Sequence, residues 1–155
     1  IDSVNINDTM PLHTIELIKE KFPVLKDVVI AVLGVSYLEG VGDTRHSPSE
    51  TLVRVLNESW AIVRAHDPYV DFWAELENVP VLKDWQTTLN DADVVIFAVG
   101  HQDYLNASPT EIIKMTGKKP LIIDCSNFLS DDRIKQYLEL GCEVKGIGKG
   151  HITSL

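Results

Sequence analysis

The residues of this chain best suited to chemistry lie between Gly34 and Glu50, where a cation, glycines and helix-start signals occur together. Arg45 is the only Lys or Arg of this stretch, and a planar guanidinium can hold a phosphate through two parallel hydrogen bonds. Two residues later, Ser47, Pro48 and Glu50 match an N-cap serine, a proline at the first helical position and a capping glutamate. Because exposed amides at a helix start favour an anion, the stretch predicts a phosphate pocket.

The glycines and the arginine of this stretch also have plainer interpretations. Gly34, Gly40 and Gly42 do not spell G-x-G-x-x-G, so dinucleotide binding in the usual pose is disfavoured. Taken by themselves, these glycines are typical of a flexible turn. Arg45 has a similar alternative, as a surface cation paired with Asp43. Its position between a strand and a helix is what favours the functional interpretation.

The elements that must position this pocket are short apolar strands that alternate with helices. Val28–Leu33 is rich in β-branched residues and predicts a strand buried on both faces. We expect further strands at 61–65, 94–99, 121–124 and 142–147, an edge strand at 79–81, and helices at 48–58, 83–90, 109–115 and 130–140. This alternation predicts a Rossmann-like, doubly wound α/β fold, with a mostly parallel sheet of five to six strands and helices on both faces. Parallel strands end at one edge of the sheet, which places the stretch after Leu33 in the ligand crevice.

A helix is expected ahead of the first strand. After Pro11, the apolar residues Leu12, Ile15, Ile18 and Phe22 recur at helical spacing. This helix either packs on the sheet or remains from a connection to a preceding domain. At the other end of the chain, the segment 148–150 is expected to fray.

The remaining polar residues form no assembled catalytic or metal centre. Asp67 precedes Pro68 and is expected to form a turn; it lies farther from Gly34 than the roughly 20 residues that separate a ribose-binding acid from its glycine fingerprint. His46 and His101 fall in loops at the ligand edge, so either can contact a ligand, but the five histidines show no metal-ligand spacing. No nucleophile, base and oxyanion hole come together, so no catalytic residue is assigned.

Composition excludes several classes of partner. The 155 residues carry a formal charge of -9, and an acidic chain lacks the basic face that nucleic acids and anionic membranes require. No apolar run approaches the roughly 18 residues of a membrane span and no signal-peptide pattern opens the chain, so we expect a cytoplasmic protein. Cys125 and Cys142 have no metal spacing and are expected to be buried, reduced thiols.

Taken together, the motifs resemble one known family. The resemblance rests on Val32-Leu33-Gly34-Val35-Ser36-Tyr37 with Asp43-Thr44-Arg45-x-Ser47-Pro48, on His66-Asp67-Pro68-Tyr69, and on Ile122-Ile123-Asp124-x-x-Asn127. These segments are similar to the C-terminal domain of the UDP-glucose/GDP-mannose dehydrogenase family. The segment Ala98-Val99-Gly100-His101 is closer to members that act on UDP-N-acetylated hexosamines, such as UDP-N-acetylmannosamine dehydrogenase. The likeness covers nearly the whole chain.

Enzymes of this family oxidise the C6 hydroxyl of a nucleotide sugar to a carboxylate for polysaccharide precursor synthesis. They use two NAD and pass through a thiohemiacetal on a cysteine. The resemblance implies that this chain binds the UDP-sugar, and that an N-terminal domain outside it holds most of the NAD and a middle region supplies the cysteine. It also implies that the full enzyme is a homo-oligomer, such as a dimer.

The resemblance further assigns regions and residues. Residues 1–24 would be the end of the central, dimerising helical region, on the likeness of Val4–Pro11, and residues 25–155 the UDP-binding domain. Ser36, Tyr37 and Leu38 are assigned to the substrate and Arg45 to the NAD pyrophosphate. No catalytic residue and no metal ligand is assigned, so the chain by itself is expected to be inactive.

Two positions depart from the family pattern. Leu38 stands where many relatives have a lysine that contacts the substrate, and Ser126 stands where a family arginine reaches a neighbouring subunit's ligand. Either another cation such as Lys149 supplies the charge, or the affinity or identity of the substrate has changed. Two other interpretations stay open: a non-catalytic α/β module kept for dimerisation or regulation, and a free-standing dinucleotide-binding domain.

Overall fold

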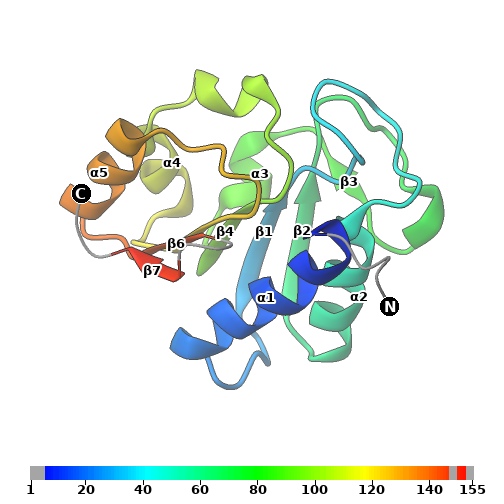
Figure 1. Ribbon diagram of the computed structural model, residues 1–155, viewed down its shortest axis with the longest axis horizontal. Coiled ribbons are helices and arrows are strands. Elements are labelled where there is room, and N and C mark those ends of the chain that lie inside the picture. The colour runs from blue at the N-terminus through cyan, green and yellow to red at the C-terminus, as the bar shows by residue number, and fades with distance from the viewer. Residues whose placement is uncertain (1–5, 147–149, 153–155) are drawn as a thin grey trace.

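A seven-stranded sheet forms the centre of the computed structural model, which describes residues 6–146 and 150–152 (Figure 1). Its strands are β1 (Val29–Leu33), β2 (Ile62–His66), β3 (Val81–Leu82), β4 (Val94–Phe97), β5 (Leu121–Asp124), β6 (Val144–Gly146) and β7 (Gly150–Ile152). They lie in the order β3-β2-β1-β4-β5-β6-β7, and every neighbouring pair is parallel except β6 and β7. The predicted doubly wound α/β fold with a mostly parallel sheet is confirmed, but the sheet has seven strands rather than five to six, because the antiparallel β7 is added at one edge.

Helices cover both faces of this sheet, as expected. They are α1 (Ile6–Lys21), α2 (Pro48–Glu58), α3 (Trp85–Leu89), α4 (Pro109–Thr116) and α5 (Asp131–Glu139), with short 3₁₀ turns η1 (Ala74–Leu76) and η2 (Gln102–Asn106). Helices α1 and α2 pack on one face, and α3, α4 and α5 pack on the other (Figure 1). None of the helices in the described ranges is both long enough and apolar enough to cross a membrane.

Strand β1 shows why its sequence is apolar at every position. Ile30 and Val32 join the core under α1 and α2, whereas Val29, Ala31 and Leu33 join the core under α3 to α5. Successive side chains of a strand point to opposite faces, so a strand with helices on both sides has no polar position. Full burial of one such aliphatic side chain contributes roughly 1.5–3 kcal/mol.

The first helix begins earlier than the sequence pattern predicted. Helix α1 starts at Ile6, so Pro11 lies inside it rather than at its start. Ile15 and Ile18 are buried against the sheet as predicted, but Leu12 is 60% exposed and leaves the expected stripe. A proline removes one helical hydrogen bond, which made Pro11 look like a boundary, yet the packing of the next two turns holds the helix together.

Contacts with the last parallel strand show that α1 packs on the sheet. The buried amino group of Lys145 donates to the carbonyl of Leu17 at 3.1 Å and to Glu20 Oε1 at 2.6 Å. Packing on the sheet was one of the two alternatives for this helix. The division of the chain into 1–24 and 25–155 stays a prediction, and residues 1–5 lie outside the described ranges.

The end of the sheet corrects the expectation of a fraying tail. Gly150 belongs to β7 and pairs with Gly146 of β6 in an antiparallel register. No apolar run marks this strand in the sequence, because a short edge strand needs only backbone pairing. Lys149, the expected alternative source of charge, lies outside the described residues. At the opposite edge, the predicted strand at 79–81 is found at Val81–Leu82.

Candidate functional site

The register of the sheet brings four loops to one edge. Leu33 lies beside His66 of β2 and beside Phe97 of β4, and Phe97 lies beside Asp124 of β5. The residues that follow these four positions therefore begin their loops side by side. Strand order reverses between β1 and β4, and a crevice at this switch point is where ligands bind in open α/β sheets.

A pocket of about 330 Å³ lies at this switch point. Three loops line it: residues 37–39 after β1, residues 98–100 after β4, and residues 125–127 after β5. Pro48 at the start of α2 and Met10 of α1 complete the wall. Several of these residues are apolar, and Glu39 is the only one of these pocket residues with a full charge. The pocket is thus of the size and kind that holds a small organic ligand rather than a bare ion.

The three residues assigned to the substrate occupy different places. Tyr37 and Leu38 line the pocket and are 41% and 55% exposed. Ser36 is fully buried beneath them, and its hydroxyl donates to the carbonyl of Leu38 at 2.9 Å. Ser36 therefore shapes the loop, while Tyr37 and Leu38 present side chains to the pocket.

Gly34 ends β1 where the loops after β1 and β4 touch. It has a φ of +105°, and a Cβ placed there would lie 2.6 Å from the Val99 Cβ. Its amide donates to the carbonyl of His66 at 2.8 Å. Only glycine combines this backbone conformation with so close an approach. The interpretation of this glycine as part of a flexible turn is therefore wrong.

Asp67 is buried and joins two of the loops. Its Oδ1 accepts the amide of Tyr69 at 2.8 Å, which confirms the predicted turn. Its Oδ2 accepts the amides of Val35 at 2.8 Å and Ser36 at 3.1 Å. Burial opposes ionisation, but the hydrogen bonds from His101 and from backbone amides outweigh it and lower the pKa of Asp67. A charged carboxylate after β2 thus fixes the start of the loop after β1.

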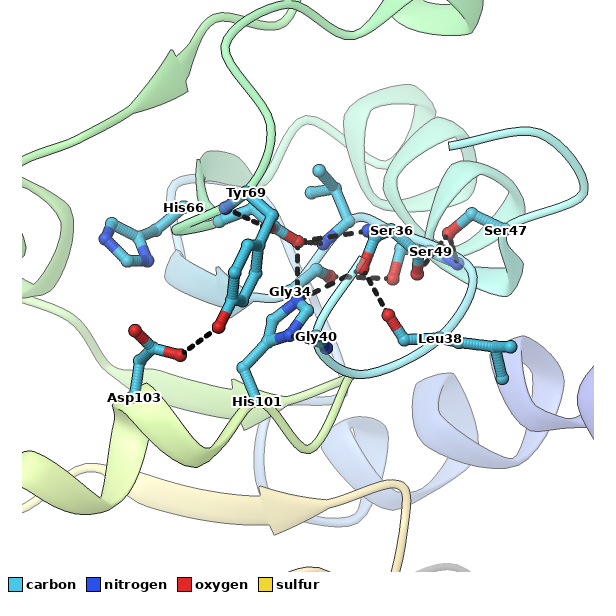
Figure 2. Close-up of polar contacts among 12 residues, drawn as sticks. Gly34, Ser36, Leu38, Gly40, Ser47, Ser49, His66, Tyr69, His101 and Asp103 are labelled. Carbon is cyan, nitrogen blue, oxygen red and sulfur yellow. Dashed lines mark hydrogen bonds and ion pairs between the residues drawn. The ribbon is translucent and has the colours of Figure 1, made fainter. Parts of the chain in front are cut away.

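His101 reaches the same loop from the opposite side of the crevice. The side chain is fully buried, although its neighbour Gly100 lines the pocket. The Gly40 amide donates to its Nδ1 at 2.9 Å, and its Nε2 lies 2.9 Å from Asp67 Oδ2 and 3.1 Å from Ser36 Oγ. Figure 2 shows the imidazole ring between Tyr69 on one side and Gly40 of this loop on the other.

Aromatic side chains pack around the polar centre that Asp67, His101 and Ser36 form. The rings of Tyr69 and Tyr104 lie 5.0 and 5.7 Å from the ring of His101. Tyr69 donates its hydroxyl hydrogen to Asp103 at 2.9 Å, which ties the loop after β2 to η2 (Figure 2). His66 contacts the buried hydroxyl of Tyr104 at 3.2 Å, and burial lowers the pKa of His66. The polar centre is therefore walled off from the solvent on this side.

The start of α2 is less open to an anion than the sequence suggested. Ser47 is the N-cap as predicted and accepts the amide of Ser49 at 3.2 Å. Pro48 has no amide hydrogen, and the amide of Glu50 donates to the Ser47 carbonyl at 3.1 Å. Contacts within the chain thus satisfy the first amides, and an anion at α2 would have to compete with them.

Arg45 is paired with Asp43 in this structure. Its Nε and Nη2 lie 3.1 and 2.9 Å from the two carboxylate oxygens of Asp43, in a bidentate geometry. These hydrogen bonds lower the pKa of Asp43 to about 2. The side chain of Arg45 is 76% exposed and does not line the pocket. The alternative pairing is found, and the assignment of Arg45 to a cofactor stays a prediction.

The loop after β5 forms the pocket wall opposite Tyr37. Asp124 accepts the amides of Ser126 at 3.1 Å and Phe128 at 2.8 Å, which turns the chain sharply after the strand. The Cys125 sulfur lies 3.3 Å from Thr14 Oγ1, and burial raises its pKa to about 12. Cys125 is thus a half-buried thiol with little thiolate character, rather than the buried one expected, whereas Cys142 is buried as predicted. Among the described side chains, no three His, Cys, Asp or Glu residues converge as metal ligands.

Sequence reasoning found most of the pocket loops but missed the bonds that hold them. Asp67 was expected only as a turn residue, and His101 only as a residue able to contact a ligand. The signal available was position, since each follows a predicted strand that ends at the crevice. What no local pattern indicates is that they meet each other across β1.

The strand order and a pocket at its reversal define a Rossmann-like α/β domain. Comparison with known proteins narrows this class. Residues 31–131 match the profile of the UDP-glucose/GDP-mannose dehydrogenase family, UDP binding domain. The chain belongs to this family.

Relatives of known name agree with this membership. UDP-N-acetyl-D-mannosamine dehydrogenase of Methanocaldococcus jannaschii is 31% identical over 129 residues, which cover 81% of this chain and 28% of that protein. A crystal structure of NDP-N-acetyl-D-galactosaminuronic acid dehydrogenase from Methanosarcina mazei superposes with a TM-score of 0.81 at 27% identity, over 92% of this chain and 30% of that one. The structure of UDP-D-ManNAc dehydrogenase from Pyrococcus horikoshii gives 0.75 at 28% identity, over 94% and 32%. The chain thus spans about a third of the length of these relatives.

Proposed function

We propose that this chain is the UDP-sugar-binding domain of an NAD-dependent nucleotide-sugar 6-dehydrogenase, which oxidises a UDP-sugar to a UDP-uronic acid in the cytoplasm. One observation carries the proposal: the three loops that line the pocket, after β1, β4 and β5, lie within the segment that matches the UDP binding domain. Relatives named for N-acetylated sugars favour a UDP-N-acetylhexosamine, with UDP-glucose as the next candidate.

The pocket favours contacts with the uncharged parts of the ligand. Tyr37 offers an aromatic surface for a base or sugar ring, and Leu38 adds an apolar one. Neither Leu38 nor Ser126 supplies the cation found in many relatives. We therefore expect the diphosphate to depend on backbone amides, with Lys149 or a neighbouring subunit of a homo-oligomer as the source of any positive charge.

The cofactor and the nucleophile are expected mainly from the remainder of such an enzyme. Arg45 is exposed and could turn towards an NAD pyrophosphate, provided that the pyrophosphate displaces Asp43. Cys125 lines the pocket, but its raised pKa of about 12 suits it poorly to form a thiohemiacetal. The isolated chain should therefore bind a substrate without turning it over.

Calorimetric titration with UDP and with NAD tests the proposal. We expect UDP to bind more tightly than NAD, and Ser126→Trp to weaken UDP binding by roughly tenfold or more, because a large ring would fill the pocket. Thr110→Trp, at an exposed position of α4, is the matched control and should bind UDP like the parent chain. Tighter binding of NAD would favour a free-standing dinucleotide-binding domain.

Two further measurements separate the roles within the proposal. Arg45→Ala should leave UDP affinity unchanged if Arg45 serves the cofactor, and a weakened titration would move Arg45 to the nucleotide-sugar. Turnover of a UDP-sugar with NAD by this chain would show that a nucleophile lies within it. An absence of UDP binding in the parent chain would instead favour a regulatory or dimerising module. Leu38 and Ser126, which depart from the family pattern, support that interpretation.

A further inference from the structure

The loop that lines one wall of the pocket is held by a side chain from the opposite wall. Residues 36–40 follow β1, and Tyr37 and Leu38 point their side chains outward. Within the loop, the Tyr37 amide donates to the Asp43 carbonyl at 2.6 Å. The far end is held by His101, which accepts the Gly40 amide at 2.9 Å (Figure 2). His101 thus contributes a tertiary contact to this loop at Gly40. The space beside Gly40 is otherwise open, since no atom lies within 4 Å of the position that a Cβ would take there.

The two partners of His101 define where its proton lies. A backbone amide can only donate, so Nδ1 must be the unprotonated acceptor for Gly40. Nε2 then carries the hydrogen and donates it towards Asp67 Oδ2 at 2.9 Å, with Ser36 Oγ at 3.1 Å. Asp67 can only accept when it is ionised. The geometry therefore requires a neutral imidazole in the Nε2–H tautomer.

We propose that His101 is a positioning residue, whose neutral Nε2–H tautomer holds loop 36–40 in its ligand-binding shape, and whose protonation at Nδ1 releases the loop at Gly40. The proposal rests on the proposed function, because it concerns the same pocket. Protonation would place two donors face to face at the Gly40 contact, while the contact with Asp67 remains. Acid should therefore loosen the wall formed by residues 37–39 without unfolding the domain.

The surroundings of His101 contain few other groups able to respond to pH. Asp67 faces Nε2, and the rings of Tyr69 and Tyr104 pack around the imidazole. Asp103 approaches only through the Tyr69 hydroxyl, and His66 acts on the site through its charge when it is protonated. Lysines and arginines are not in contact with the imidazole within the described residues.

Two substitutions test the roles of the two imidazole nitrogens one at a time. In His101→Asn, the amide oxygen can take the place of Nδ1 and accept from Gly40, but the link to Asp67 is lost. In His101→Gln, the amide nitrogen can take the place of Nε2 and donate to Asp67, but Gly40 loses its acceptor. UDP affinity of each variant is measured by calorimetry at about pH 8 and at about pH 5. His13→Gln, at an exposed position of α1, is the matched control.

We expect the parent chain to lose roughly tenfold or more in UDP affinity on acidification, and the His13 variant to behave alike. At the higher pH, His101→Gln should bind more weakly than His101→Asn, and neither should retain the acid-dependent loss. If both variants lose affinity equally and keep the pH dependence of the parent chain, His101 is only a packing residue and the proposal fails.

A readout without ligand keeps this proposal apart from the proposed function. The Gly40 amide resonance should move, and its hydrogen-exchange protection factor, taken relative to the intrinsic exchange rate at each pH, should fall, on acidification of the parent chain and in His101→Gln at every pH. The resonances of residues in β1 and β4 should stay in place, which shows that the domain remains folded. A responding Gly40 in a chain that does not bind UDP overturns the proposed function and supports the positioning role. A Gly40 amide indifferent to pH and to His101→Gln overturns the positioning role, whatever UDP does.

Discussion

Helices α2 and α4 begin with nearly the same four residues but use them differently. Their starts are Ser47-Pro48-Ser49-Glu50 and Ser108-Pro109-Thr110-Glu111. In α4 the capping box closes on itself: the serine hydroxyl accepts the Glu111 amide at 3.2 Å, and the glutamate accepts the Ser108 amide at 2.9 Å. In α2 the glutamate turns away and pairs with Arg54 at 3.0 Å.

The difference follows from what each helix start faces. Ser49 is fully buried and donates its hydroxyl hydrogen to the carbonyl of Gly34 at 2.9 Å, whereas Thr110 is exposed. The start of α2 is therefore part of the framework that holds the pocket loop, and the start of α4 is a local cap. The same short motif specifies a helix start in both places, but tertiary contacts decide what its side chains do.

The largest expected difference in stability is between alanine substitutions at two glycines with positive φ, Gly34 beside the pocket loop and Gly117 at the end of α4. Gly34→Ala should destabilise the domain by about 4 kcal/mol, because backbone strain adds to a clash with Val99. Gly117→Ala, at the end of α4 with open space around it, should cost only about 1 kcal/mol. Urea unfolding of both variants gives the difference. Equal losses would show that Gly34 is not a tightly packed junction.

The next effect concerns two of the carboxylates whose pKa is lowered, Asp67 at the pocket and Glu111 at the α4 cap. Hydrogen bonding to the charged form depresses each folded-state pKa, so each contributes stability above its ordinary value of 3.8 or 4.5 and loses it as the pH falls further. Asp67→Asn should cost about 2 kcal/mol at neutral pH, because a buried charged acceptor is lost.

The pH dependence of unfolding distinguishes these two carboxylates. Asp67→Asn should flatten the acid-side loss of stability more than Glu111→Gln does, because Asp67 is buried and Glu111 is exposed to screening by the solvent. Thermal unfolding of the three proteins from neutral pH down to about pH 3 measures this. A larger change in the Glu111 variant would contradict the buried, ionised state of Asp67.

The smallest effect compares the third residue of each helix start. Ser49→Ala should lose about 1 kcal/mol, because the buried Gly34 carbonyl is left without its donor. Thr110→Ala should change stability by no more than about 0.5 kcal/mol, as is usual at an exposed position. The midpoints of denaturant unfolding of the two variants measure this difference in stability. If Ser49 proves as tolerant as Thr110, the two helix starts are equivalent after all.

The parts predicted well from the sequence are those whose cause is local. Val29–Leu33 is apolar throughout because helices cover both faces, and Ser47, Ser108 and Ser130 cap helices because their hydroxyls accept nearby amides. The order of strands and helices then follows from short connections and right-handed crossovers.

The parts missed are those decided by residues distant in sequence. Pro11 suggested a helix boundary, yet the turns that follow it pack on the sheet. Asp67 and His101 lie 34 residues apart, and their contact exists only because β1 stands between β2 and β4. Arg45 is a different, local case, because its pairing with Asp43, two residues away, was one of the two interpretations that the sequence left open.

Amide chemical-shift mapping of this chain during titration with UDP tests most directly whether UDP occupies the pocket at the strand switch point. We predict saturable shifts at residues 37–39, 98–100 and 125–127, with α4 and α5 undisturbed. Shifts confined to other parts of the described chain, or no shifts at millimolar UDP, would contradict it.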